Sequence, residues 1–289
     1  MASVAQLKSH IRSVNNTKQI TSAMQLVAAS KMRRATARSL STQPYHRYLS
    51  SLLIHLASQD VARNHPLLAE REVKTRLLIV IASDTGLAGS YNSNILKLYL
   101  KELNHDREQG IKTKTIAIGR KAIRLASRLG EDVIGTYEGV SSGPATAERN
   151  AIAATAIAEF TKHSVDAVDI IYTNYHSPVN QTVDVWKLLP AGQSSNLENE
   201  SADDNVYIFE PNKDEVFNAL VKRTIEVQVA QTLFDSIASE HSTRMLAMKN
   251  ATDNAEELSL DLTLAMNKER QAAITSELSD INNGANAVE

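Results

Sequence analysis

The chain has 289 residues, with 31 Lys or Arg against 33 Asp or Glu, so its formal net charge is −2 at pH 7. This balance gives no reason to expect nonspecific binding to nucleic acid. The absence of cysteine excludes a disulfide framework, a thiolate nucleophile and a cysteine-type zinc site. No apolar run approaches the ~20 residues of a membrane span, and the N-terminus lacks a signal pattern. We therefore expect a soluble protein of a reducing compartment, without direct membrane insertion.

The first segment, residues 1–60, is predicted to be a coiled-coil helix. Its apolar residues recur at steps of three and four, typical of a coiled-coil seam, at Val4, Leu7, Ile11 and Val14. After a slip in register, we expect the seam to continue through Ile20, Met24, Val27 and Ala28. Pro44 is expected either to kink this helix or to lie in the first turn of a new one.

The middle segment, residues 75–190, has the pattern of a small α/β domain. Short apolar runs predict strands at 77–82, 113–118, 168–172 and 183–189, and helical patterns cover 92–104, 120–128 and 145–163. Strands that alternate with helices indicate a Rossmann-like fold with a mainly parallel sheet. An acidic linker with a short extended piece is expected at 191–211.

The last segment, residues 212–289, is predicted to form one long helix, because neither Pro nor Gly occurs between Pro211 and Gly284. Its expected seam runs through Val227, Ala230, Phe234, Ile237, Met248, Ala251, Ala255, Leu258, Leu262 and Ala265. Two seam positions, His241 and Arg244, are polar. We expect them at a flank that water covers, and the alternative is a polar layer that sets the register.

Because one long helix opens the chain and the other closes it, they are predicted to pair as an antiparallel coiled coil with the α/β domain inserted between them. A helix of this length exceeds the needs of a compact domain, since seventy residues span roughly 105 Å. A coiled coil formed between two chains, as in a dimeric scaffold, is the competing arrangement.

Residues 83–90 follow the first strand and contain Gly86 and Gly89, a place where α/β folds cradle phosphates. The segment does not fit G-x-G-x-x-G, and no G-K-[ST] occurs. We interpret it as a tight turn in which Asp84 or Ser90 caps the next helix. The alternative is a nucleotide- or phosphate-binding enzyme with a coiled-coil arm. The scattered histidines predict no metal site.

Two polar groups on the helices are candidate interaction sites. Lys31, Arg33, Arg34 and Arg38 form either a solvated face or a surface that docks an acidic partner. Near the end of the last helix, Arg270, Gln271, Thr275 and Glu277 are either surface residues or a tip that offers directional hydrogen bonds to a groove.

Four stretches together resemble the gamma subunit family of the F-type rotary ATP synthase. They are residues 16–32 (NTKQITSAMQLVAASKM), 83–89 (SDTGLAG) with Asn92, 238–245 with 247–255, and 267–278 (NKERQAAITSEL) with Gly284 and Ala285. The similarity covers the whole chain in the right order.

The resemblance implies a non-catalytic central-stalk rotor subunit without cofactor or metal. Its expected partners are a hexamer of alpha and beta subunits, the epsilon subunit and a proton-driven membrane ring of c subunits. Catalysis of ATP synthesis or hydrolysis would reside in the beta subunits. The absence of a transit segment favours a bacterial source, and hence the cytoplasmic face of the plasma membrane.

The resemblance also implies roles for particular residues. Arg270 and Gln271 match a pair that hydrogen-bonds a catch loop of a catalytic subunit, and Thr275 and Glu277 match positions coupled to Met24. The basic stretch of Lys31, Arg33 and Arg34 is similar to one that faces acidic beta-subunit loops. The segment of Tyr207 and Glu210 resembles the contact with the membrane ring. The chain departs from the family pattern at Lys18, Gln19, Ser22, Thr85 and Ala88.

Overall fold

The computed structural model describes residues 3–57, 65–139, 143, 146–191, 210 and 212–286. The helices are α1 (Val4–Ala57), α2 (Tyr91–Glu108), α3 (Arg120–Leu129), α4 (Thr146–Thr161) and α5 (Lys213–Asn286); the strands are β1 (Thr75–Ile81), β2 (Lys112–Ile118), β3 (Asp132–Tyr137), β4 (Ala167–Tyr175) and β5 (Gln181–Leu189). The expected extended piece at 207–209 lies outside the described residues, as does the acidic stretch 193–205.

The chain divides into two compact units. Unit 1 consists of Met1–Ala28 and Arg244–Glu289, and unit 2 consists of Ala29–Thr243. The helices α1 and α5 therefore each contribute one part to unit 1 and another to unit 2. Pro44 lies inside α1, so no new helix begins there.

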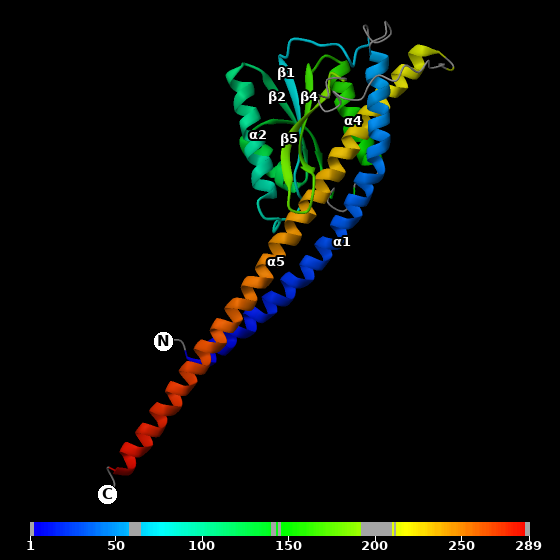
Figure 1. Ribbon diagram of the computed structural model, residues 1–289. Coiled ribbons are helices and arrows are strands. Elements are labelled where there is room, and N and C mark those ends of the chain that lie inside the picture. Colours follow the sequence, from blue (N-terminus) through cyan, green and yellow to red (C-terminus); the bar gives the residue numbers. More distant parts are fainter. Residues whose placement is uncertain are drawn as a thin grey trace. The chain divides into compact units, whose positions relative to one another are not determined.

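Unit 2 contains a five-stranded sheet with the order β3-β2-β1-β4-β5 (Figure 1). The strands β1, β2, β3 and β4 pair in parallel, and β5 runs antiparallel to β4. The central strand is apolar, and its Ile79 lies opposite Ile116 on one side and Ile170 on the other. This arrangement confirms the predicted mainly parallel α/β fold, with one further strand, β3, that the sequence pattern did not predict.

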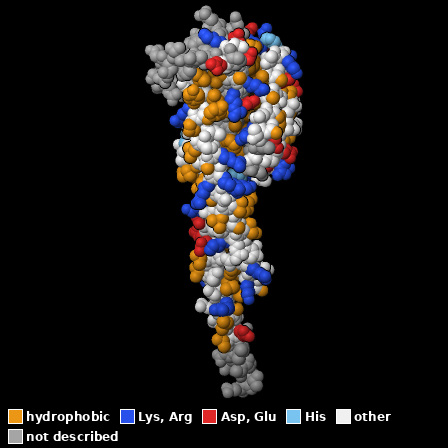
Figure 2. Space-filling view, turned by 90° about the vertical axis from the view of Figure 1, so that its right-hand side faces the viewer, with side chains coloured by type: hydrophobic (Ala, Val, Ile, Leu, Met, Phe, Trp, Pro, Cys, Tyr) orange, Lys and Arg blue, Asp and Glu red, His pale blue; other side chains and the backbone are white. Residues whose placement is uncertain are grey.

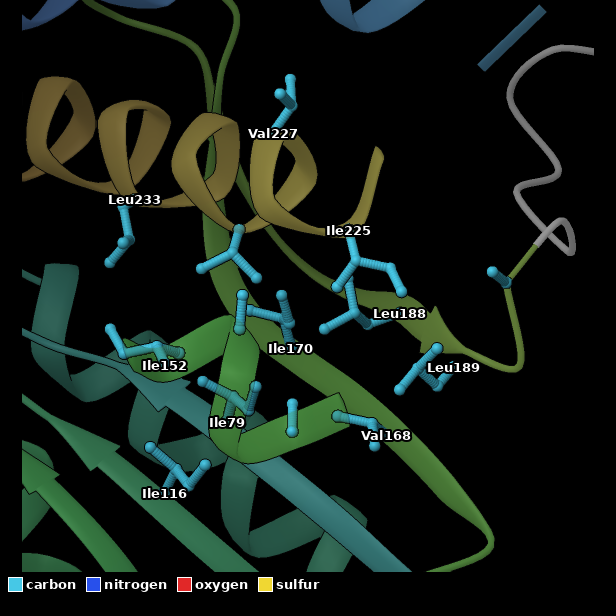
Figure 3. Close-up of a cluster of buried hydrophobic side chains, with 14 of the residues drawn as sticks. Ile79, Ile116, Ile152, Val168, Ile170, Leu188, Leu189, Ile225, Val227 and Leu233 are labelled. Atoms are coloured by element: carbon cyan, nitrogen blue, oxygen red, sulfur yellow. The ribbon is translucent and has the colours of Figure 1, made fainter. Parts of the chain in front are cut away.

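Helices cover both faces of the sheet. The helices α2 and α3 pack on one face, where Tyr91, Ile95 and Tyr99 of α2 are buried against β1 and β2. The other face packs against α4 and the first part of α5 (Figure 1). In Figure 3, Ile225 and Leu233 of α5 point toward the sheet, whereas Val227 points away from it. The first part of α5 is therefore buried on two sides, against the sheet and against α1.

The seam of α1 keeps a strict seven-residue repeat. The repeat consists of buried or half-buried residues, namely Leu7, Val14, Thr21, Ala28, Ala35, Thr42 and Leu49. The expected slip in register was therefore wrong. Ile20 and Val27, both expected in the seam, are 60% and 57% exposed, because the seam positions beside them are occupied by Thr21 and Ala28. Met24 is half-buried.

The seam of α5 also differs from the prediction. Phe234, Met248 and Ala255 are buried as expected, but Leu258 is 49% exposed and the seam instead includes polar Thr252 and Ser259. The expectation that water covers His241 and Arg244 was also wrong. Their exposed fractions are 2% and 7%. The polar seam positions of this helix are therefore buried, in unit 2 for His241 and in unit 1 for Arg244.

Within each unit, α1 and α5 pair in antiparallel directions. In unit 1, Lys18 Nζ lies 2.9 Å from Glu256 Oε1, and Ser259 Oγ donates a 3.1 Å hydrogen bond to Asn15 Oδ1. A step of three along α1 thus matches a step of three backward along α5. In Figure 1 the C-terminal end of α5 extends past the N-terminus of α1.

A second set of polar contacts joins the two helices in unit 2. Ser39 Oγ donates a 2.6 Å hydrogen bond to Asp235 Oδ1, and Thr42 Oγ1 donates one of 2.7 Å to Gln231 Oε1. These pairs again step by three or four residues in opposite directions. The predicted antiparallel coiled coil of the two terminal helices is therefore confirmed, and it forms within one chain.

Candidate functional site

The uncovered end of α5 carries four of the predicted interaction residues. Every described side chain from Arg270 to Ser279 is exposed. Thr275 Oγ1 donates a 2.9 Å hydrogen bond to the Gln271 carbonyl within the helix. Arg270 and Glu277 form no ion pair with any residue that the structure describes. Both side chains are exposed to solvent.

The exposed end also presents apolar side chains. Ile274 and Leu278 are exposed and lie four residues apart, on one side of the helix. Arg270 lies one further turn toward the N-terminus on the same side. A cation beside two exposed apolar residues suits a surface that combines hydrogen bonds with apolar contact. The four-residue spacing of Arg270, Ile274 and Leu278 places the three side chains on one side of the helix, and the structure shows that all three are exposed.

The structure does not bring Met24 together with Thr275 and Glu277. Met24 follows Thr21, and Thr21 hydrogen-bonds Thr252 of α5. At 1.5 Å per residue, Glu277 lies about 37 Å farther along α5 than Thr252. Any coupling between these positions must therefore pass through the coiled coil or through a partner subunit, because direct contact does not occur.

The basic residues of the first helix lie in unit 2. Lys31 is half-buried, whereas Arg33 and Arg34 are exposed. Figure 2 shows Lys and Arg side chains interspersed with hydrophobic ones along the helical surface that it presents. Lys18, a departure from the family pattern, lies in unit 1, where its ammonium pairs with Glu256. Its positive charge is thus matched within the chain.

Of the two residues expected at the membrane-ring contact, Tyr207 lies outside the described residues. Glu210 is described and exposed. It precedes the start of α5, where Asn212 Oδ1 accepts a 2.8 Å hydrogen bond from the Glu215 amide and Asn212 Nδ2 donates to Glu215 Oε1. This reciprocal cap fixes the beginning of the helix next to Glu210.

The glycine-containing turn after β1 is filled by polar groups of the chain itself. Asn92 Oδ1 accepts hydrogen bonds from both the amide and the hydroxyl of Ser83. Asp84 Oδ1 accepts from the amides of Arg120 (3.3 Å) and Gly139 (3.2 Å). Ser90, the N-cap of α2, makes no side-chain capping hydrogen bond, so that expectation was wrong.

The position of Asp84 bears on the phosphate-binding alternative. In doubly wound folds the carboxyl ends of the strands and the helix N-termini beside them attract anions. Here the Asp84 carboxylate already accepts a hydrogen bond from the first residue of α3. A β-carbon at Gly119 would lie 2.1 Å from the Ala82 carbonyl oxygen, so the chain is close-packed there. Because its polar groups bond within the chain and its backbone is close-packed, we assign the turn a structural role.

Sequence reasoning missed a buried charged cluster near the start of the central strand β1, at the end of the sheet opposite to the turn after β1. Arg76 of β1 contacts Glu102, Asp106 and Asp169 at 2.9, 2.9 and 2.6 Å. Burial alone would lower the pKa of Arg76, but the neighbouring carboxylates more than offset it and raise that pKa. Burial raises the pKa of Asp169 despite the opposing effect of Arg76. The positive charge of Arg76 thus offsets part of the negative charge of these three carboxylates.

Two of the remaining departures from the family pattern have plain surroundings. Ala88 is buried in the apolar cluster under α2, and Thr85 is exposed. Among the described residues, no group of three or more His, Asp or Glu side chains is placed to hold a metal ion. No described helix has the length and apolar character needed to cross a membrane.

Comparison with known proteins gives matches over nearly the whole chain. A family model described as ATP synthase matches residues 3–288. The ATP synthase gamma chain of Glaesserella parasuis serovar 5 is 38% identical over 290 residues, and that of Histophilus somni (strain 129Pt) is 36% identical over 292 residues. Both alignments cover 100% of each chain.

Solved structures show the same likeness. A chain from the central stalk and c-ring of Tetrahymena thermophila mitochondrial ATP synthase is 27% identical, with a TM-score of 0.63 over 80% of this chain and 99% of that chain. A chain from the Euglena gracilis mitochondrial ATP synthase, in an OSCP/F1/c-ring structure, has a TM-score of 0.69 and covers 99% of this chain and 94% of that chain. At 17% identity, the second match concerns the fold alone.

Proposed function

Since this chain belongs to the family of ATP synthase gamma chains, we propose that it is the central-stalk rotor subunit of a bacterial proton-translocating ATP synthase. Family membership confirms the resemblance drawn from the sequence. The chain is a non-catalytic subunit, and ATP is made or hydrolysed on the beta subunits. Its role is to couple rotation of the membrane ring to conformational changes in the alpha/beta hexamer.

The observation that carries this proposal is the pairing of α1 and α5 over most of their length, with the end of α5 left uncovered. An axle must transmit torque without one helix sliding along the other. In unit 1 the pairs Lys18–Glu256 and Asn15–Ser259 fix the register by directional polar contacts. Such contacts oppose sliding because a shift by one residue breaks them.

Within this proposal, the uncovered end of α5 contacts the catalytic subunits. Arg270 and Gln271 would hydrogen-bond a loop of a beta subunit, with Thr275 and Glu277 one to two turns beyond. Their exposure supports this assignment. An exposed guanidinium suits the directional recognition of carboxylate or carbonyl oxygens, because its five N–H groups have a fixed geometry.

We assign the neck contacts to Met24, Lys31, Arg33 and Arg34. The cations would face acidic loops of the beta subunits, which long-range attraction would favour at each angular position. Exposure of Arg33 and Arg34 supports this assignment. Met24 would couple indirectly to Thr275 and Glu277, through the coiled coil or a beta subunit.

The α/β domain is assigned to the membrane side of the stalk. Tyr207 and Glu210 would contact the ring of c subunits, and the epsilon subunit would lie beside the domain. This arrangement places the chain at the cytoplasmic face of the bacterial plasma membrane as a peripheral subunit. The exposure of Glu210 next to a firmly capped helix start supports a contact at this end of α5.

Co-expression with alpha and beta subunits tests the proposal. We expect the chain to purify with them as one complex with ATPase activity, and the isolated chain to sediment as a monomer. Tight stoichiometric binding of nucleotide to the isolated chain at the turn after β1, without complex formation, would instead favour the enzyme alternative. A stable dimer of the isolated chain would favour the scaffold.

A further inference from the structure

A basic hollow of about 140 Å³ lies in unit 2, between α1, α5 and the loop that contains Gly143. Ala35, Phe234 and Ile237 form its apolar part, and all three are buried. Its polar part includes Lys31, Arg34 and Arg38, which lie three and four residues apart and so share one side of α1. We name this feature, with its lining residues, the basic hollow.

Within the described residues, the three cations of the basic hollow have no ion-pair partner. Neither Lys31, Arg34 nor Arg38 forms an ion pair with any residue in the part of the chain that the structure describes. One acidic side chain, Glu240, lines an adjacent hollow together with Lys31.

A fourth cation lies close to the hollow. The guanidinium carbon of Arg149 lies 5.0 Å from the centre of the Phe234 ring, and Phe234 lines the hollow. Burial, followed by the positive charges of Arg38 and Arg223, lowers the pKa of Arg149. Arg223 has Glu226 as a partner, whereas neither Arg38 nor Arg149 forms an ion pair with a described residue. Such crowding of like charges is unfavourable unless an anion offsets it.

Backbone geometry brings the loop close to Arg38. A β-carbon at Gly143 would lie 2.6 Å from Arg38 Nη1, and the φ of Gly143 is +99°. Glycine is therefore required for this close approach and this conformation. Gly143 therefore lies against the guanidinium of Arg38, and it lines the hollow together with residues of α1 and α5.

We propose that the basic hollow binds a small phosphate-bearing anion, held by Arg38 and Arg149 with Lys31 and Arg34 at its mouth. Guanidinium groups match phosphate oxygens with paired hydrogen bonds, and phosphate offers several acceptors in a small volume. A hollow of about 140 Å³ suits a single phosphate or diphosphate group better than an acidic protein segment. The inference does not depend on the rotor function, which stands or fails separately.

Titration calorimetry of the full-length chain with inorganic pyrophosphate, at one fixed ionic strength, tests the proposal. We expect one saturable site, and we expect Arg38→Ala or Arg149→Ala to weaken binding about tenfold, because a hydrogen bond to a charged group contributes ~1.5–3 kcal/mol. The matched control is Arg47→Ala, which removes an exposed cation of α1 outside the hollow. Its affinity should change less than twofold.

Circular dichroism and thermal melts establish that each variant is folded before the affinities are compared. Absence of saturable binding to the folded native chain overturns the proposal. Equal weakening by Arg47→Ala and Arg38→Ala also overturns it, since diffuse attraction to any basic surface would then account for the binding. Binding of an acidic decapeptide but not of pyrophosphate overturns it as well, and assigns the surface to a protein partner.

Discussion

Thr252 Oγ1 donates a 2.7 Å hydrogen bond to Thr21 Oγ1, so two hydroxyl groups meet in the seam of unit 1. Thr21 Oγ1 in turn donates to the Lys18 carbonyl at 3.0 Å. A hydroxyl pair at a seam position sacrifices apolar burial, but it fixes which residues face each other. The coiled coil of unit 1 thus has its register set partly by polar contacts.

We predict that Thr21→Val and Thr252→Val each lower the free energy of unfolding by about 1 kcal/mol, because each removes the hydrogen bond between the two helices and leaves the other hydroxyl with only its carbonyl partner in its own helix. The double variant should lose less than the sum, since both hydroxyls are then gone. Urea unfolding followed at 222 nm measures these values. Thr17→Val is the control, because the Thr17 hydroxyl bonds only within its own helix. Strict additivity would contradict the coupling.

The charged cluster around Arg76 gives a pH-dependent prediction. Arg76→Met leaves Glu102, Asp106 and Asp169 together without their cation, at a cost of about 3–5 kcal/mol in unfolding free energy at pH 7. The pKa of Asp169, already raised by burial, should rise further. When the pKa of a carboxyl group is higher in the folded than in the unfolded state, the free energy of unfolding decreases as the pH rises from the unfolded-state pKa through the folded-state pKa. The deficit should therefore shrink as the pH falls.

Urea unfolding at pH 7 and pH 4.5 measures this effect. Lys74→Met provides the matched control, because Lys74 lies two residues away and pairs with Glu72 only at the surface. We expect less than about 0.5 kcal/mol for the control at both pH values. A deficit of the Arg76 variant that is equal at the two pH values would show that the carboxylates do not cause it.

Asp235 offers a second test in the interface of α1 and α5 in unit 2. Burial raises its pKa, although hydrogen bonds from Ser39 and Gln231 oppose the shift. Native Asp235 therefore contributes less stability as the pH rises from its unfolded-state pKa through its raised folded-state pKa. Asp235→Asn cannot titrate, so its stability relative to the native chain should increase with pH across that window. Paired unfolding curves from pH 3 to pH 7 measure the difference, and a constant difference would contradict the shift.

How much of this fold could be predicted from sequence depends on how apolar each element is. The run 77–82 predicted the central strand because it is buried on both faces. The edge strand Asp132–Tyr137 was missed because its side chains are at most half-buried and its pattern is weak. The α/β class therefore followed from the sequence, while the number of strands did not.

The seams show a second reason for error. Ile20, Val27 and Leu258 were expected in the seams because they are apolar, yet they lie at exposed positions. Thr21 and Thr252 occupy seam positions that an apolar pattern cannot reveal. Exposed apolar residues on a coiled coil suggest contacts with other subunits, and this information is absent from one chain taken alone. The interaction residues at the end of α5 stay a prediction: their position near the end of the helix made them candidates, and the family resemblance supplied their roles.

The uncovered end of α5 gives a functional prediction. In the complex with alpha and beta subunits, Arg270→Ala with Gln271→Ala should lower ATPase turnover at least about tenfold, because the loss of even one hydrogen bond to a charged group costs ~1.5–3 kcal/mol. Assembly should be largely intact, since both side chains are exposed and support no contact within the chain. The control is Lys268→Ala, an exposed cation two residues away. Unchanged turnover of the double variant would remove this site assignment.

The central claim, that this chain turns inside its complex, can be measured by observing its rotation. Because the chain has no cysteine, Glu108→Cys, at an exposed position of α2, introduces a single thiol for a bead or fluorophore. With the alpha/beta hexamer fixed to a surface, we predict continuous rotation of the label in one direction while ATP is hydrolysed. Sustained hydrolysis with a label that keeps one orientation would contradict the rotor function.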